Sequence, residues 1–246
     1  MTLPDKTEIL RKVTEKGGYL ISSFLNPSRL NLLLEEFDGV FCKIPDKAHA
    51  VVGEGSNPVV DKLTYSSGKH LRVTPNQYLH FPELLEVIKS PYLMSLAANY
   101  LGDLMNYTMQ VFMSHEYNVI LKEDLVNVRS NSHLHWDPYH SLKFMLYLTD
   151  VDERNGATCY VPGTRSLGQE YRESRMDITS TLGLEGGVPN RLKDYEKYPK
   201  YSEEDAIPVV AKAGDLLVFD TDALHCGGNI QEAGLERKII LLHNRR

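Results

Sequence analysis

The sequence has 246 residues, 42% of them hydrophobic and 24% charged, with a formal net charge of −6. This length suits one β-rich domain with a large core, and the composition is that of a soluble globular protein. A negative chain without a Lys/Arg-rich block argues against nucleic acid as the main partner. Its apolar runs fall short of the roughly 18 residues of a membrane span.

Cysteine usage indicates the compartment. Cys42, Cys159 and Cys226 are scattered and form no Cys-x-x-Cys pair, which fits a reducing cytoplasm better than a disulfide scaffold. The first residues lack the charged-then-apolar pattern of a secretion signal. We therefore expect a cytoplasmic protein. The sequence leaves its oligomeric state open.

The first part of the chain, residues 1–105, is predicted to be mostly helical. Helical spacing of apolar residues, proline at first helical positions and glycine after the last turn mark the elements. They are a helix over 5–16, a strand over 19–25, a helix opened by Asn26-Pro27, and two helical pieces over 82–101 separated at Ser90-Pro91.

Residues 43–70 have a different character. They are polar, weakly periodic and contain the loop signal Val52-Gly-Glu-Gly-Ser-Asn-Pro58. Long loops in folded domains are often functional. We interpret this stretch as an irregular loop and a candidate lid over a site.

From residue 106 onward the pattern changes to short β-like runs separated by Gly, Pro, Asn and Asp. Helices followed by many short strands predict a mainly β fold, a sandwich or jelly roll with helices outside it. Residues 166–206 interrupt it as an irregular insert, equally consistent with a solvated surface segment and a substrate-covering one. The predicted strands cover 107–113, 117–121, 141–149, 157–161, 207–211, 215–219 and 236–243.

Three histidines and a carboxylate fall within residues 133–140. Residues i and i+2 of a strand face the same way, so His135 and Asp137 can bind one metal ion. A third ligand, His225, follows the strand at 216–220. Two histidines and one carboxylate with open positions are typical of non-haem Fe(II) oxygenases.

Other histidines leave alternatives open in the same motif. His133 shares the face of His135 and Asp137, so His133 with His135 could bind the metal instead. His133 and His140 are otherwise candidates to support the ligands or face a substrate, as Tyr139 is, or plain polar residues.

Arg237 starts a β-like run 12 residues after His225. An arginine in an apolar strand is costly to bury unless it is paired, and a guanidinium pairs bidentately with a carboxylate. We therefore predict that Arg237 anchors the distal carboxylate of 2-oxoglutarate. The alternative is a strand-end arginine that reaches solvent.

These pieces together resemble the phytanoyl-CoA dioxygenase-like branch of the Fe(II)/2-oxoglutarate-dependent oxygenases. The resemblance covers most of the chain apart from about 43–70 and 166–206. The matching segments are Gly17–Pro27, Ile88–Gly102, His135-Trp-Asp137, Tyr147–Thr158, Val161-Pro-Gly-Thr-Arg165, Ala213-Gly-Asp215, His225 and Arg237.

The resemblance implies one domain over 1–246 with a double-stranded β-helix (cupin-like jelly roll) core in 106–246. It implies Fe(II), 2-oxoglutarate and O₂ as reaction partners and a small-molecule substrate. Met145 stands where the family often has an aromatic residue beside the co-substrate. Related halogenases lack the carboxylate, so Asp137 favours hydroxylation.

The substrate is not specified by the sequence. Lys143, Met145 and Tyr147 share one strand face; if that face points inward, Lys143 could meet an acidic group of the substrate. The opposite orientation, with Phe144, Leu146 and Leu148 inward, is equally consistent.

Three other functions also fit parts of the sequence. They are a jelly-roll metal-binding module without catalysis, a cupin-type metalloenzyme that does not use 2-oxoglutarate, and a Zn²⁺ hydrolase. The lack of a general base beside the ligands disfavours the hydrolase.

Overall fold

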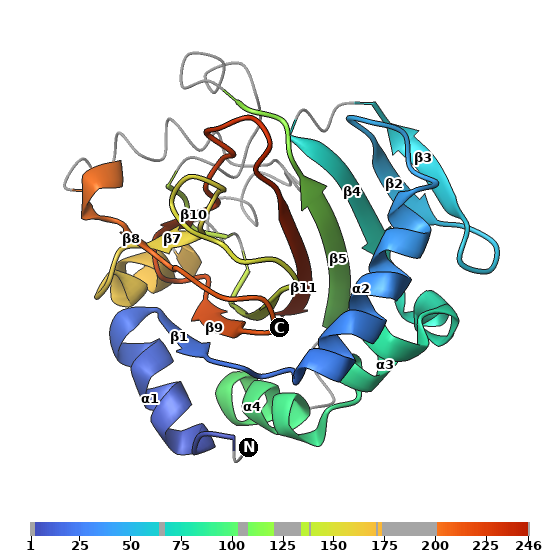
Figure 1. Ribbon diagram of the computed structural model, residues 1–246. Helices are drawn as coiled ribbons and strands as arrows, with labels where there is room; N and C mark the ends of the chain where they lie inside the picture. Colours follow the sequence, from blue (N-terminus) through green and yellow to red (C-terminus); the bar gives the residue numbers. More distant parts are fainter. Residues whose placement is uncertain are drawn as a thin grey trace, which may run out of the picture.

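An eight-stranded mixed sheet forms the centre of the computed structural model, which describes residues 3–63, 67–102, 108–120, 134–137, 139–170, 172–173 and 201–245. Its strand order is β1-β9-β6-β11-β5-β4-β2-β3, and a smaller sheet of order β10-β7-β8 lies on one side of it (Figure 1). All pairs are antiparallel except β2 with β4. The predicted fold class, a mainly β jelly roll with flanking helices, is confirmed.

The second half of the chain contributes strands to both sheets. The main sheet contains β1 (Gly18–Ile21), β2 (His49–Val52), β3 (Pro58–Lys62), β4 (Gly68–Val73), β5 (Thr108–Glu116), β6 (Ser141–Tyr147), β9 (Leu216–Asp220) and β11 (Arg237–Arg245). The small sheet contains β7 (Cys159–Tyr160), β8 (Ile207–Pro208) and β10 (His225–Cys226).

The helices cover the other side of the main sheet and end where the sequence signals predict. Asp5 caps α1 (Lys6–Lys16) through Oδ1, and Gly17 ends it with φ 98°. Asn26 caps α2 (Pro27–Phe41). The predicted break at Ser90-Pro91 is confirmed, because α3 (Pro82–Ile88) and α4 (Pro91–Leu101) are separate helices. Two short 3₁₀ helices are also present, η1 (Pro75–His80) and η4 (Glu203–Asp205).

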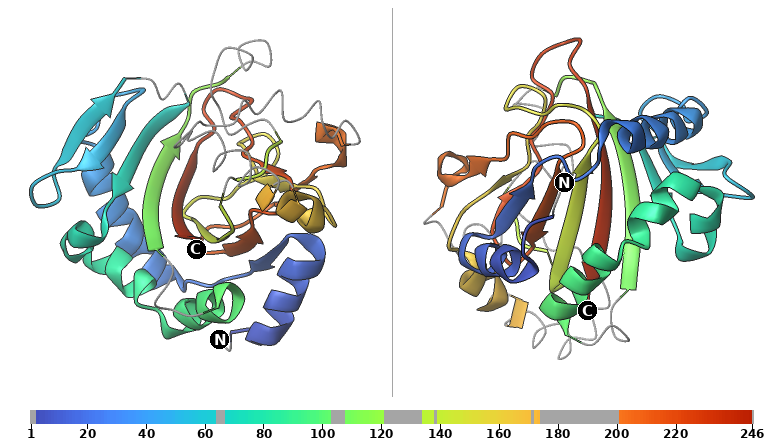
Figure 2. Two further views of the ribbon diagram at one scale, coloured as in Figure 1. Left: turned by 180° about the vertical axis from the view of Figure 1, so that it is seen from behind. Right: turned by 60° about the horizontal axis from the view of Figure 1, so that its bottom comes forward.

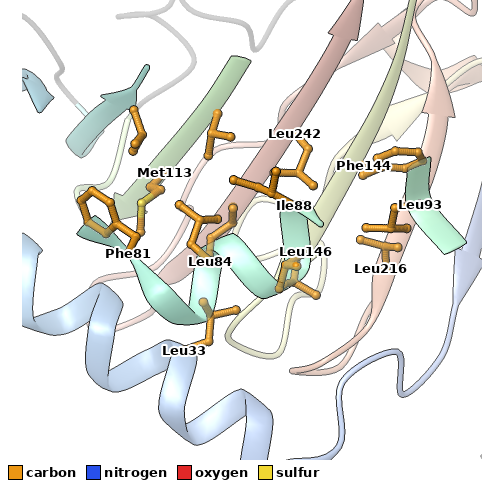
Figure 3. Packing of buried hydrophobic residues seen from close by; sticks show 14 of the residues in the cluster. Leu33, Phe81, Leu84, Ile88, Leu93, Met113, Phe144, Leu146, Leu216 and Leu242 are labelled. Carbon is orange, nitrogen blue, oxygen red and sulfur yellow. The ribbon is translucent and has the colours of Figure 1, made fainter. Parts of the chain in front are cut away.

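The main core lies between these helices and the outer face of the main sheet (Figures 1 and 2). Phe144 and Leu146 of β6 and Leu242 of β11 point into it, and each is at most 1% exposed. Leu33 of α2 and Leu84 of α3 pack against them (Figure 3). Because side chains alternate along a strand, the neighbours of these residues point to the inner face, toward the small sheet. That face carries Lys143, Met145 and Tyr147, so the first of the two orientations is the one observed.

Two local predictions are wrong. Residues 43–70 do not form an irregular loop: β2 and β3 pair as a hairpin at the edge of the main sheet, and β4 begins at Gly68. These strands are only four and five residues long, and β3 is mostly exposed, so the sequence offered too short an alternation to mark them. The strand expected over 117–121 is not formed at 117–120, since β5 ends at Glu116.

Some predictions lie outside the described residues. His133 and residues 174–200 of the predicted insert are among them. At its described start, residues 165–170 are helical. None of the helices in the described part of the chain has the length and apolar character needed to cross a bilayer.

Candidate metal centre

His135 and His225 face each other across an isolated antiparallel bridge. The His135 amide donates to the His225 carbonyl at 2.9 Å, and the His225 amide donates to the His135 carbonyl at 3.1 Å. Reciprocal bonds of this kind hold two residues directly opposite each other. The two imidazole rings consequently lie 4.4 Å apart, centroid to centroid. Segments 90 residues apart in the sequence thus meet at one point.

Asp137 completes a three-donor cluster on the same side. Its Oδ1 lies 3.7 Å from His135 Nε2 and 3.9 Å from His225 Nε2. All three residues are buried, with exposures of 6% for His135, 8% for Asp137 and 4% for His225. A cation about 2.1 Å from each donor would place neighbouring donors about 3 Å apart. The three donors therefore fit one ion after drawing in by less than an ångström each, by that order-of-magnitude estimate.

A backbone carbonyl group, that of Ala223, fixes the orientation of the His225 ring. Its Nδ1 lies 2.9 Å from the Ala223 carbonyl oxygen, which can only accept a hydrogen bond. Nδ1 is therefore the protonated nitrogen, and Nε2 keeps the lone pair that a metal requires. Carbonyl groups commonly hold metal-binding histidines in this manner. The sequence alone did not predict the Ala223 carbonyl as the partner of His225.

The second oxygen of Asp137 faces a cation supplied by the chain. Lys143 Nζ lies 2.6 Å from Asp137 Oδ2 and forms an ion pair with it. The ammonium group is also 5.7 Å from the ring centroid of Phe219. His243 Nε2, on β11, is 3.9 Å from the same oxygen and 2.9 Å from Ser141 Oγ. Asp137 thus presents Oδ1 to the histidines and Oδ2 to Lys143.

These neighbours determine the charge state of Asp137. Burial by itself would raise the pKa of its carboxyl group. Lys143, followed by His225, His135 and His243, outweighs burial and holds that pKa well below the ordinary value of 3.8. Asp137 is therefore a carboxylate at neutral pH, the form that binds a metal ion.

Arg237 lies on the inner face, but it is already paired. It is 4% exposed, and its Nη2 donates to Glu116 Oε2 at 2.5 Å. Its Nη1 donates to the carbonyl of Gly156, a residue with φ 89° in the turn after β6. The alternative of a solvent-reaching arginine is excluded. A guanidinium has five N–H donors, so the pair with Glu116 does not by itself saturate it.

Met145 and Tyr147 line the inner face between the metal donors and Arg237. Register places Met145 opposite Leu241 and Tyr147 opposite Ile239 on β11. Thr158 donates its hydroxyl hydrogen to Met145 Sδ at 3.2 Å. An apolar cluster surrounds them: Val151, Ala157, Val209, Ala211, Leu217, Phe219 and Ile239. These side chains make this part of the inner face apolar.

The remaining predicted site residues are not part of the three-donor cluster. Tyr139 is 49% exposed. His140 lies elsewhere: its Nδ1 is 3.0 Å from Asp222 Oδ2, and its ring stacks on Tyr100. His133 lies outside the described residues. Within the described residues, the third donor beside His135 and Asp137 is His225.

The half-buried His140 belongs to a second cluster with the buried Asp220 and Asp222, and the donor atoms of the three are also close enough for one cation. Arginines already balance both carboxylates. Arg165 Nε lies 2.7 Å from Asp220 Oδ2, and Arg172 pairs with Asp222. Tyr100 donates its hydroxyl hydrogen to Asp220. This cluster attaches the described start of the insert to the turn that precedes His225.

Sequence reasoning missed several members of the site. Glu116 and His243 were not singled out, although His243 has the same strand parity as Arg237 and could have been noticed. Glu116 could not, since its partnership depends on the Arg237–Glu116 register between β11 and β5. The Asp220 and Asp222 cluster similarly joins four distant segments.

Comparisons with known proteins place the fold and the family. The family model described as phytanoyl-CoA dioxygenase (PhyH) matches residues 13–238. No curated protein matches the chain by sequence. The chain belongs to the phytanoyl-CoA dioxygenase (PhyH) family, as the sequence motifs predicted.

Solved structures share the fold at low sequence identity. One is the non-haem α-ketoglutarate-dependent carbocyclase SnoK from nogalamycin biosynthesis (16% identity, 97% of this chain and 83% of that chain covered, TM-score 0.61). A second is the corresponding epimerase, SnoN (14%, 97% and 81%, TM-score 0.58). A third is EvdO2 from Micromonospora carbonacea var. aurantiaca, in complex with 2-oxoglutarate (14%, 97% and 90%, TM-score 0.57).

Proposed function

We propose that this protein is an Fe(II)- and 2-oxoglutarate-dependent oxygenase that hydroxylates a small molecule. His135 Nε2, Asp137 Oδ1 and His225 Nε2 would hold the ion, and Arg237 would take the distal carboxylate of 2-oxoglutarate. Family membership supports the proposal, and so do the structural neighbours described as α-ketoglutarate-dependent. The observation that carries it is the buried cluster of two imidazoles and one carboxylate, a donor set that leaves three positions of an octahedral ion open.

Each residue has a separate task in this proposal. Coupling the reduction of O₂ to the conversion of 2-oxoglutarate into succinate and CO₂ is the chemistry that such an ion supplies. Ala223 keeps His225 in the metal-binding tautomer, and Lys143 keeps Asp137 charged and turned toward the histidines. The apolar inner wall keeps bulk water away from the reacting groups.

The proposal extends to the whole chain. Residues 1–105 would support the jelly roll of residues 106–246 as parts of one catalytic domain. The cysteines Cys42, Cys159 and Cys226 are free thiols, which fits the cytoplasmic location that we propose. Hydroxylation is favoured by the presence of Asp137, because a carboxylate ligand occupies the position that a halide would need.

One observation favours a second candidate function. Glu116 already pairs with Arg237, so an incoming carboxylate would have to share the guanidinium with a buried anion. A cupin-type metalloenzyme that does not use 2-oxoglutarate would meet no such competition. The two candidates differ in whether the dicarboxylate binds at all.

The test is anaerobic addition of Fe(II) and then 2-oxoglutarate to the purified protein. We expect a weak visible charge-transfer band, followed by succinate formation when O₂ is admitted. His135→Ala and Asp137→Ala should abolish both signals, while His80→Ala, at an exposed histidine of η1, should keep them. An Fe(II)-loaded wild-type protein without the band would contradict the proposal and favour the second candidate.

A further inference from the structure

Two cysteines lie directly opposite each other in the small sheet. Cys159 of β7 is the register partner of Cys226 of β10. Opposed residues of an antiparallel pair point to the same face of the sheet, with Cβ atoms about 4.5–5.5 Å apart. Both cysteines are reduced thiols; Cys226 is buried and Cys159 is half-buried. Neither has a task in the proposed function.

Backbone hydrogen bonds on either side define the geometry of this cysteine pair. The Val161 amide donates to the Leu224 carbonyl at 2.8 Å, and the Gly228 amide donates to the Ala157 carbonyl at 3.1 Å. Because hydrogen-bonded pairs recur at every second position of an antiparallel ladder, the cysteines midway between them form such a pair, with Cα atoms about 5.5 Å apart. Disulfides span Cα separations of about 4.4–6.8 Å, but their Cβ atoms lie closer, about 3.8 Å apart. A disulfide can therefore form if the two strands draw together by roughly an ångström.

The cysteine pair lies back to back with the metal centre. Side chains alternate along a strand, so Cys226 points away from the face to which its neighbour His225 points. On that far face Cys226 is clustered with Leu134 and Trp136, and Cys159 packs against the same cluster. A change in the spacing of β7 and β10 therefore moves the backbone that carries His225.

The position favours a disulfide that is easily reduced again. The hydrogen-bonded ladder holds the strands at their spacing, so closing the S–S bond stores strain, and strained disulfides are the labile and regulatory ones. Disulfides of cytosolic proteins are usually transient and redox-sensing, which matches the location that we propose. In the reduced state the Cys159 thiol donates to the Ala157 carbonyl at 3.4 Å, a weak bond that oxidation removes at little cost.

We propose that Cys159 and Cys226 are a redox-modification site: hydrogen peroxide joins them in a reversible disulfide, and this bond weakens metal binding at the neighbouring three-donor cluster. The effect on the metal rests on the proposed function, whereas formation of the disulfide does not. The more exposed Cys159 thiol takes one oxygen atom from the peroxide to become a sulfenic acid, and one water leaves. The Cys226 thiol then displaces that oxygen as a second water and forms the S–S bond. Two thiols lose two electrons, and one peroxide is reduced to two waters.

The metal centre is sensitive to a movement of this size. The donors of His135, Asp137 and His225 fit one ion only after drawing in by an appreciable part of an ångström each. A backbone shift of about an ångström next to His225 displaces its imidazole relative to His135. We expect a roughly tenfold loss of metal affinity, which is the size of effect that disturbing the support of a metal ligand produces.

The experiment treats the metal-free full chain with hydrogen peroxide, removes the peroxide, and measures the mass of the protein and its Kd for Mn(II). The metal-free protein is used because bound iron would itself react with peroxide. A disulfide lowers the mass by two hydrogen atoms, whereas sulfinic acid and methionine sulfoxide raise it. Peptide mapping identifies the joined residues. Cys159→Ser and Cys226→Ala each remove one partner, and Cys42→Ser removes the exposed thiol at the end of α2 as a matched control.

We expect the wild type and Cys42→Ser to lose two hydrogen atoms, to show the Cys159–Cys226 crosslink and to bind Mn(II) roughly tenfold more weakly. Dithiothreitol should restore both the mass and the affinity. Cys159→Ser and Cys226→Ala should keep their Mn(II) affinity after peroxide treatment. Because coupling between two equilibria is reciprocal, saturating Mn(II) should make the disulfide easier to reduce, raising its reduction potential by about 30 mV for a tenfold effect.

The possible failures are distinguishable. Peroxide-treated wild type without the Cys159–Cys226 crosslink would overturn the inference and leave the proposed function standing. A crosslinked protein with unchanged Mn(II) affinity would overturn the effect on the metal, and so would an equal loss of affinity in Cys159→Ser, which would mean that peroxide attacks the ligands directly. A reduced wild type that binds no Mn(II) would overturn the proposed function, while the mass measurement would still decide whether the disulfide forms.

Discussion

Strands β6 and β11 carry two different kinds of side chain on their two faces. Toward the helices they present Phe144, Leu146, Ile240 and Leu242, none more than 1% exposed. Toward the small sheet the same strands present ionisable groups, among them Lys143, Arg237 and His243. The charged groups of the inner face are tolerated because each has a close partner, as Lys143 has in Asp137 and Arg237 has in Glu116. The outer face therefore supplies the apolar core, whereas the inner face holds buried, paired charges.

Breaking the outer face should lower stability strongly and leave metal binding intact. Leu242→Ala removes a buried side chain from the helix-side core, and we expect a loss of about 2–5 kcal/mol in the free energy of unfolding. Chemical denaturation measures this loss. Mn(II) affinity of the folded fraction should not change, and a tenfold loss of that affinity would contradict the separation of the two faces.

Breaking the inner ion pair should have a different signature. Lys143→Met leaves the buried Asp137 carboxylate without its main counter-ion, and we expect the metal-free protein to lose about 3–5 kcal/mol of stability. A bound divalent ion replaces the missing charge. Mn(II) should therefore raise the melting temperature more in Lys143→Met than in the wild type.

The matched control for that prediction is Lys143→Arg, which keeps the charge. It should respond to Mn(II) much as the wild type does. Equal metal-induced shifts in Lys143→Met and the wild type would show that Lys143 does not serve as the counter-ion of Asp137.

A smaller effect on the free energy of unfolding should appear in acid, and it comes from His70 on β4. Burial, followed by the charges of His49 and Arg72, lowers the pKa of His70 from 6.5 to about 3. Because the folded state binds a proton less readily than the unfolded chain, stability falls as the pH decreases from 6.5 toward 3. For this residue the loss between pH 7 and pH 5 is at most about 2 kcal/mol.

His70→Phe keeps a ring against Phe112, 5.6 Å away in the wild type, but removes the titration. Denaturation at pH 7 and pH 5 should show a smaller acid-induced loss in this variant. The same pH dependence in both proteins would mean that His70 is not held in its neutral form.

The smallest expected effect concerns the competition at Arg237. Glu116→Gln removes a negative charge beside the guanidinium, so the proposed dicarboxylate should bind roughly 3- to 10-fold more tightly. Glu36→Gln is a control, because Glu36 accepts hydrogen bonds from the amides of Glu83 and Leu84 at the start of α3. It should change stability and leave binding unaltered. Weaker binding in Glu116→Gln would mean that Glu116 supports the subsite instead of competing for it.

Local signals allowed much of this molecule to be predicted from its sequence. Asn26-Pro27 and Ser90-Pro91 determine helix ends through backbone geometry alone, and the i, i+2 spacing of His135 and Asp137 puts both side chains on one face. His225 could be proposed from its place after the strand at 216–220, and Arg237 because an arginine in an apolar strand is costly to bury unless it is paired.

The rest depends on register and on pairing between distant segments. The Glu116–Arg237 pair requires β5 beside β11, and the His140–Asp222 contact requires two turns to meet. The hairpin of β2 and β3 lies at the sheet edge, and its strands are too short, with β3 mostly exposed, for their sequence pattern to identify them. Alternation indicated that Lys143 and Leu146 point to opposite faces, but only the packed helices show which face is inner.

The account depends most directly on where a divalent ion binds. Crystals grown anaerobically with Fe(II) can be measured at the iron absorption edge, so that anomalous scattering locates the metal independently of the chain. We predict one peak about 2.1 Å from His135 Nε2, Asp137 Oδ1 and His225 Nε2. A peak at the His140, Asp220 and Asp222 cluster instead, with none between the two opposed histidines, would contradict the account.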